Sequence, residues 1–199
     1  MATKALNEIY DRQSQAPDAM AHHMSVLREL AAEHDRVAEI GIRRGSSTLA
    51  LLAGCSGEVW SCDIEEMPVH ALIADANGRG GRRGRWRRWY MPSEEWEWPE
   101  GETVGLLCID GYHTYSQVKA ELDRFADRVT GTLVFHDTMS CGIKGDGIAN
   151  RSIHSSKMME DELGIRLAID ELMIRDPSWR IASHDPEASG LLVLRRSPE

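Results

Sequence analysis

The sequence predicts an α/β fold in which a doubly wound, mainly parallel seven-stranded sheet ends in an antiparallel C-terminal hairpin. Three observations support this prediction. Short apolar runs with strand character alternate with segments of helical periodicity. A glycine-containing turn joins the first predicted strand to a helix. Two strand-like runs separated by a polar turn close the chain. Such alternation places helices on both faces of a parallel sheet, with ligands at the carboxyl ends of the strands.

The predicted elements follow from hydrophobic spacing. A helix over residues 17–34 starts near Pro17, which suits a first helical turn. Further helices are predicted at 47–53, 69–77, 115–128 and 164–176. The strands are predicted at 37–42, 58–64, 85–91, 104–110, 132–136, 179–183 and 191–195. Residues 139–157 are glycine-rich and polar, which predicts a loop or a lid.

Length and composition indicate one ordinary domain over residues 1–199. Of these residues, 42% are hydrophobic and 28% are charged, which suffices for one core. The sequence lacks an apolar run of about 20 residues, which a membrane helix needs, and its start lacks a signal-peptide pattern. We therefore expect a cytoplasmic protein without membrane contact. The four cysteines form no CxxC pair, so we expect free thiols.

Charge is distributed unevenly along the chain. The net charge of -9 disfavours a general nucleic-acid binder. The run Arg79–Arg88 is an exception, because its six arginines, interleaved with glycine and tryptophan, could contact RNA phosphates. Five glutamates follow within residues 94–102. We therefore favour a solvated surface in which these charges neutralise one another.

The most informative local motif is the turn after the first predicted strand. Residues 39–47 read Glu-x-Gly-x-x-x-Gly-x-Ser, and the two glycines let the backbone approach a ligand closely. A dinucleotide-binding turn would carry another glycine at position 43, where this chain has Arg43. The turn therefore indicates a small ligand against the sheet and disfavours NAD.

This turn resembles the first motif of class I methyltransferases, which have a Rossmann-like fold and bind S-adenosylmethionine. Asp63 ends the second predicted strand 22 residues after Gly41, where an acid can accept hydrogen bonds from both ribose hydroxyls. The resemblance also implies that Ser93 lies in the adenine pocket. It further implies that the cofactor contacts four residues of the turn, with its carboxylate facing a helix N-terminus: Glu39, Gly41, Gly45 and Ser47.

Acidic and histidine side chains follow two later strands. Asp110 and His113 lie at the end of one strand, and His136 and Asp137 end the next. Two carboxylates at one sheet edge can share a divalent cation that lowers the pKa of a substrate hydroxyl. We predict Asp110 and Asp137 as metal ligands and His113 as general base. The alternatives are a metal-free contact of Asp110 with the cofactor, and a structural role for His113 as a helix cap.

These two clusters resemble the cephalosporin hydroxylase and macrolide sugar O-methyltransferase group, together with small bacterial and viral class I methyltransferases. The likeness covers roughly residues 18–195. In the sugar enzymes, the positions matching Asp110 and Asp137 bind magnesium, and the position matching His113 supplies the base. His136 stands where those enzymes carry an acid, which is a departure at the metal site because magnesium prefers oxygen ligands.

Together these patterns predict a methyltransferase that uses S-adenosylmethionine, and Mg²⁺ or another divalent cation, to methylate a hydroxyl of a small molecule. His113 would remove the proton from that hydroxyl. One alternative is an RNA-modifying methyltransferase that uses the run Arg79–Arg88. Another is a cofactor-binding module without catalysis. The sequence is compatible with a homo-oligomer.

Overall fold

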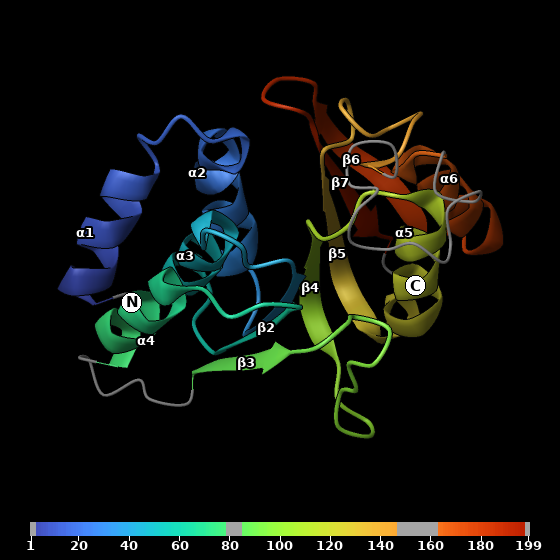
Figure 1. Cartoon of the computed structure of the whole chain (residues 1–199). Coiled ribbons are helices and arrows are strands. Elements are labelled where there is room, and N and C mark those ends of the chain that lie inside the picture. The colour runs from blue at the N-terminus through green and yellow to red at the C-terminus, as the bar shows by residue number, and fades with distance from the viewer. Residues whose placement is uncertain (1–2, 79–84, 147–162, 198–199) are drawn as a thin grey trace.

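The computed structural model describes residues 3–78, 85–146 and 163–197 (Figure 1). Its strands form one sheet in the order β3-β2-β1-β4-β5-β7-β6. Strands β1 to β5 pair in parallel, whereas β7 runs antiparallel to both β5 and β6. The predicted fold class is thereby confirmed, including the closing hairpin. The strands are β1 (Arg36–Ile40), β2 (Glu58–Asp63), β3 (Trp86–Tyr90), β4 (Val104–Ile109), β5 (Val129–His136), β6 (Trp179–Asp185) and β7 (Leu191–Arg196).

Helices cover both faces of this sheet. Helices α2 to α4 lie on one face with α1 packed outside them against α3 and α4, and α5 and α6 pack against the other face (Figure 1). A 3-10 turn at Ala126–Arg128 connects α5 to β5. The helices are α1 (Lys4–Gln13), α2 (Ala19–Ala32), α3 (Ser46–Gly54), α4 (Pro68–Gly78), α5 (Tyr115–Phe125) and α6 (Ile165–Arg175).

Helix α1 is not predicted from the sequence. It is a short polar helix in which only Leu6 and Tyr10 are buried. Its apolar residues Ala5, Leu6, Ile9 and Tyr10 nevertheless lie at helical spacing, so the pattern could have indicated it. Thr3 starts it, because the Thr3 hydroxyl accepts a hydrogen bond from the Leu6 N–H at 3.0 Å. The same hydroxyl donates to the carbonyl oxygen of Ala76 at 2.8 Å, which fixes α1 against the end of α4.

The alternation of side chains along each strand divides the apolar residues between two cores. Val37 of β1 packs with α1 to α4, whereas its neighbour Ala38 packs with α5 and α6. The second core includes an aromatic cluster in which the closest ring centroids, those of Trp98 and Phe125, are 4.7 Å apart. The other rings of this cluster are Trp60, Trp89 and Trp96.

The described part of the arginine run contacts the protein itself. Arg85 is buried and donates from Nε to the carbonyl oxygen of Gly57 at 2.5 Å. Arg87 pairs with Glu58 at 2.7 Å. The guanidinium of Arg88 lies 4.7 Å from the centre of a Trp86 ring. The expected surface is therefore only partly as predicted: Arg87 is paired with an acid, but that acid is Glu58 and not a glutamate of 94–102, and Arg85 is buried and not solvated. Arg79, Arg82 and Arg83 lie outside the described residues.

Two further expectations concern the cysteines and the membrane. All four cysteines are buried and free. Within the described ranges, no helix combines the length and the apolar character that crossing a membrane requires.

Candidate active site

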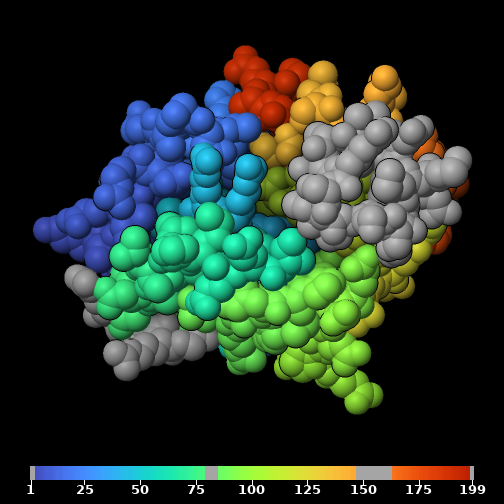
Figure 2. Space-filling view, in the orientation of Figure 1, coloured from blue at the N-terminus to red at the C-terminus, as the bar shows by residue number. Residues whose placement is uncertain are grey.

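A cleft of about 910 Å³ opens at the carboxyl ends of β1, β2, β4 and β5. Its volume lies in the range of small-molecule sites. The space-filling view shows the surface hollowed beside the cyan side chains that follow β1 (Figure 2). Of the predicted site residues, eight line the cleft: Gly41, Ser47, Asp63, Ser93, Asp110, His113, His136 and Asp137.

The glycine turn brings the end of β1 against the end of β4. Gly41 has φ +92°, and a Cβ at this position would lie 2.1 Å from the carbonyl oxygen of Asp110. Gly45 caps the start of α3 with φ +79°, where a Cβ would lie 2.4 Å from Cδ1 of Ile73. Gly41 therefore requires glycine for both conformation and space, because the obstacle is rigid backbone. At Gly45 the positive φ favours glycine, and the obstacle is the flexible end of the Ile73 side chain. Gly45 itself does not line the cleft, so it shapes the turn from behind.

Glu39 lies beneath the turn and not in the cleft. Its side chain is fully buried and accepts hydrogen bonds from Ser47 Oγ at 2.7 Å, Thr48 Oγ1 at 2.6 Å and Ser61 Oγ at 2.5 Å. Burial raises its pKa to about 7, against the opposing effect of these three hydrogen bonds. The sequence suggested a direct cofactor contact for Glu39. In the structure the carboxylate instead ties the first turn of α3 to β1 and β2.

Asp63 connects the second strand to the same turn. Its Oδ2 accepts the backbone N–H groups of Ile42 at 2.6 Å and Arg43 at 2.8 Å. Its Oδ1 accepts the N–H of Glu65 at 3.2 Å. Because Asp63 also lines the cleft, it fixes the turn and faces the ligand space at once. Its binding of ribose hydroxyls stays a prediction.

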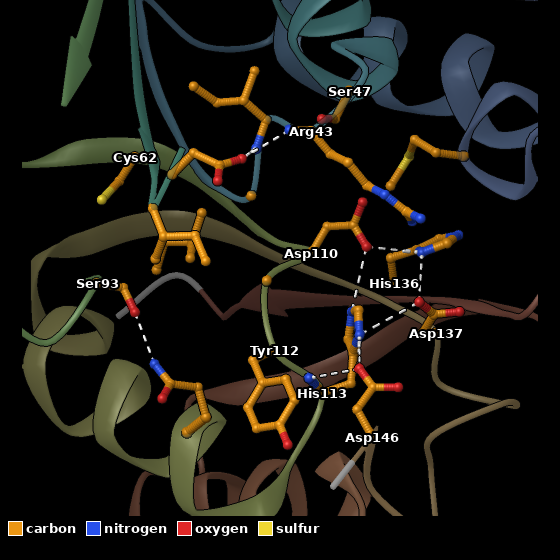
Figure 3. A pocket seen from close by; sticks show the side chains of 18 of the residues that line it. Arg43, Ser47, Cys62, Ser93, Asp110, Tyr112, His113, His136, Asp137 and Asp146 are labelled. Atoms are coloured by element: carbon orange, nitrogen blue, oxygen red, sulfur yellow. Dashed lines mark hydrogen bonds and ion pairs between the residues drawn. The ribbon is translucent and has the colours of Figure 1, made fainter. Parts of the chain in front are cut away.

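The acidic and histidine residues after β4 and β5 form one cluster (Figure 3). Nδ1 of His136 lies 2.9 Å from Asp110 Oδ1 and 3.4 Å from Asp137 Oδ2. His113 lies among three carboxylates: its Nε2 is 3.3 Å from Asp110 Oδ1, and its Nδ1 is 3.4 Å from Asp137 Oδ2. The shortest contact of His113, 2.9 Å, joins its Nδ1 to Asp146 Oδ2.

The charges in this cluster stabilise one another. Burial alone would lower the pKa of His113, but its pairing with Asp110 and Asp146 outweighs burial and raises the pKa to about 10. Pairing with Asp110 and Asp137 likewise raises the pKa of His136 to about 9, against the effect of burial. For Asp110 and Asp137, burial would raise the pKa, yet the two histidines hold it below the usual value. At neutral pH both imidazoles are therefore cationic in the metal-free protein.

Asp146 is a member of this cluster that the sequence did not indicate. Its carboxylate accepts the backbone N–H of His113 at 3.2 Å, and its own N–H donates to the carbonyl oxygen of His113 at 3.1 Å. It belongs to the segment 139–157 that is predicted as a loop or lid, and residues 147–157 lie outside the described residues. Spacing gives no signal for it, because 33 residues separate Asp146 from His113.

A second residue that sequence reasoning missed is Glu121 on α5. Ser93 donates to Glu121 Oε1 at 2.6 Å, and Gln117 donates to the same oxygen at 3.0 Å. Burial raises the pKa of Glu121 to about 7, although these hydrogen bonds oppose it. All three residues line the cleft. The i, i+4 spacing of Gln117 and Glu121 could have indicated a shared polar face on an otherwise amphipathic helix.

The donor set of the cluster suits a divalent cation. One ligand atom from each of four residues lies within 4.8 Å of the others: Asp110, His113, His136 and Asp137. Nε2 of His113 and Nε2 of His136 are buried without a hydrogen-bond partner. Two imidazoles with two carboxylates fit a borderline transition-metal ion better than magnesium, which prefers oxygen ligands.

Comparison with solved structures shows the same fold in methyltransferases. The O-methyltransferase TomG from Streptomyces achromogenes, in complex with SAM, is 12% identical, with a TM-score of 0.64 over 100% of this chain and 92% of that chain. The SAH complex of an O-methyltransferase from Bacillus cereus is 17% identical, with a TM-score of 0.59 over 97% and 90%. The 1,6-didemethyltoxoflavin-N1-methyltransferase from Burkholderia thailandensis is also 17% identical, with a TM-score of 0.62 over 98% and 84%.

The fold is thus the Rossmann-like methyltransferase fold, with the cleft at its expected edge. A family model described as a methyltransferase domain matches residues 38–138, just over half of the 199 residues. The chain belongs to this methyltransferase family. The comparison with curated proteins gives no match.

Proposed function

We propose that this protein is an S-adenosylmethionine-dependent methyltransferase that acts on a hydroxyl of a small molecule. The observation that carries the proposal is one cleft that joins the glycine turn, Asp63 and the acid-histidine cluster. The turn and Asp63 provide a place for a nucleoside cofactor, and the cluster provides groups for proton transfer beside it. The complexes of similar folds with SAM or SAH support the choice of cofactor.

In the half of the cleft where the cofactor is proposed to bind, each polar residue has a proposed role. Asp63 would accept hydrogen bonds from the ribose hydroxyls while it holds the turn. Ser47, in the first turn of α3, lies where backbone N–H groups favour a carboxylate. Ser93 and Glu121 form the hydrogen-bonded pair at the opposite wall, where the adenine is proposed to bind.

The acceptor half contains the proposed base. His113 accepts a proton only in its neutral form, and the carboxylates around it hold its proton at neutral pH. A divalent cation held by Asp110, His136 and Asp137 would polarise an acceptor hydroxyl and lower its pKa. Neutralisation of Asp110 and Asp137 would also lower the pKa of His113 towards neutrality. Asp146 would then keep the imidazole oriented through Nδ1.

Calorimetry with S-adenosylmethionine and S-adenosylhomocysteine tests the cofactor, with and without Mg²⁺ or Mn²⁺. We expect binding of both compounds, and Asp63→Asn should weaken it by about tenfold or more because charge-assisted hydrogen bonds to the ribose are lost. Asp127→Asn is the matched control, since Asp127 is an exposed acid outside the cleft. Absence of binding by the wild-type protein would refute the proposal.

His113→Gln tests the base once an acceptor has been found by screening small hydroxylated compounds. We expect methyl transfer to fall by about 10²–10⁴-fold while the affinity for S-adenosylmethionine changes little. Retention of full transfer by this variant would exclude His113 as the base and leave the cofactor assignment intact.

A further inference from the structure

A second group of metal-ligand atoms lies outside the cleft, where α2 meets the hairpin of β6 and β7. Nε2 of His22 is 3.6 Å from Asp185 Oδ2 and 3.6 Å from Glu187 Oε2. Nδ1 of His23 is 3.6 Å from the same Asp185 oxygen. The three donor atoms of His22, His23 and Asp185 all lie within 4.8 Å of one another. Two segments that are distant in sequence therefore converge on one point.

The main evidence for a ligand at this group comes from His23. Its side chain is fully buried, and its Nε2 lies 3.3 Å from the carbonyl oxygen of Ala188. A carbonyl oxygen can only accept, so Nε2 carries the hydrogen and Nδ1 offers its lone pair. Nδ1 is buried without a hydrogen-bond partner. Buried nitrogens of this kind normally have a partner, and the carboxylate at 3.6 Å is too distant to provide one by a hydrogen bond.

The spacing of these atoms suits a small cation between them. With metal–ligand bonds of about 2.0–2.1 Å, two ligands of a tetrahedral zinc ion lie about 3.4 Å apart. The three nitrogen–oxygen separations of 3.6 Å are close to that value. Imidazoles combined with carboxylates suit zinc and similar borderline divalent ions.

We propose that His22, His23 and Asp185, with Glu187 as a fourth ligand, bind one borderline divalent cation such as Zn²⁺ at a site separate from the catalytic cleft. The cation would join α2 to the hairpin.

This site would also support one wall of the cleft. Ser189 in the same hairpin lines the cleft, and its carbonyl oxygen accepts the N–H groups of Met139 at 2.8 Å and Ser140 at 3.2 Å. Ser140 in turn donates to Asp137 Oδ1 at 2.6 Å. The ring of His23 lies 5.5 Å from that of His136. Metal binding at the hairpin would therefore stabilise the segment that carries Asp137.

The test uses full-length, tag-free protein stripped of metal and titrated with Zn²⁺ in a calorimeter. In the background His113→Gln/Asp137→Asn, which removes a ligand from each of the two candidate metal groups of the cleft, we expect one equivalent of Zn²⁺ to remain bound. Adding His22→Gln to this background should weaken Zn²⁺ binding by more than about tenfold, because one of the proposed metal ligands is removed. His184→Gln is the matched control, since this histidine lies on the same hairpin and bonds Thr138 instead.

A second measurement covers the case in which the double background does not fold. Zn²⁺ should raise the Tm of His22→Gln less than that of the wild-type protein, and the bound Zn²⁺ measured by elemental analysis should fall by one equivalent. Equal Zn²⁺ content of His22→Gln and wild type would overturn the proposal, as would the absence of Zn²⁺ from a folded double background. Neither result depends on S-adenosylmethionine binding, so the proposed function is tested separately.

Discussion

Glu39 accepts three hydroxyl hydrogen bonds although it is fully buried. A buried acid in this place holds the glycine turn and the start of α3 in position, because it fixes Ser47 and Thr48. The positions of these two residues determine where the backbone N–H groups of α3 face the cleft. The sequence identifies the position as important, because an acid inside an apolar strand is unusual. The sequence does not show whether Glu39 contacts the ligand directly or holds in place the turn that contacts it.

Replacement of Glu39 separates these two roles. Glu39→Ala should lower the free energy of unfolding by about 2–4 kcal/mol, because three buried hydroxyls lose their acceptor. Glu39→Gln keeps an acceptor and the shape of the side chain, so we expect a loss of only about 1 kcal/mol. Urea unfolding of both variants provides the measurement. If Glu39→Ala proves as stable as the wild-type protein but cannot bind cofactor, the direct-contact interpretation would be restored.

At the scale of elements, the close approach of β1 and β4 depends on Gly41. Any side chain there meets the backbone carbonyl of Asp110, which is a residue of the acid-histidine cluster. The turn that would hold the cofactor and the strand end that carries the acid are therefore positioned by the same contact.

A pair of glycine variants tests this contact. Gly41 and Gly101 both have positive φ, but a Cβ on Gly101 would meet nothing within 4 Å. Gly101→Ala should therefore cost only about 1 kcal/mol of stability, from conformational strain. Gly41→Ala adds a backbone clash, so we expect a larger loss of stability and loss of S-adenosylmethionine binding. Thermal unfolding and calorimetry measure both effects; equal stability losses would contradict the argument.

Periodicity predicted the sheet well, and its failures have physical causes. Strand β5 begins at Val129, three residues before the predicted start, because Thr130 and Gly131 interrupt the apolar pattern without interrupting the strand. Strand β6 continues to Asp185, two residues beyond the predicted end, because its last residues are exposed and polar and therefore lack an apolar pattern. The cluster after β4 and β5 could be predicted because parallel strand ends meet at one edge. Asp146 could not, since a loop brings it there. For Glu121 the helical spacing with Gln117 indicates a polar face of α5, but not that this face lines the cleft.

At the scale of the whole molecule, the acid-histidine cluster makes stability depend on pH. The pKa values of His113 and His136 rise from 6.5 to about 10 and about 9 on folding. Between the unfolded pKa of 6.5 and the folded pKa of each histidine, the folded protein holds a proton that the unfolded chain has released. The stabilisation is therefore complete below about pH 6.5, and it is lost as the pH rises through 9 and 10.

From these two pKa increases we expect metal-free protein to lose several kcal/mol of unfolding free energy, at most about 6 kcal/mol, between pH 7 and pH 10. His113→Gln should lose less over the same interval, because it has one histidine fewer to deprotonate. Urea unfolding at both pH values, compared between the two proteins, isolates this contribution from other groups that titrate. Identical pH dependence of the two proteins would show that His113 does not hold an extra proton.

The aromatic cluster of the second core has an optical consequence. The rings of Trp60, Trp89, Trp96 and Trp98 are linked by centroid separations of 5.5–6.2 Å, close enough for excitation to pass among them. Emission from any of these indoles therefore reports on the whole group, which lies between the sheet and helix α5. Trp86 lies in the first core and Trp179 in the second, so intrinsic fluorescence should follow the loss of both cores during unfolding, with the ring cluster reporting on the second.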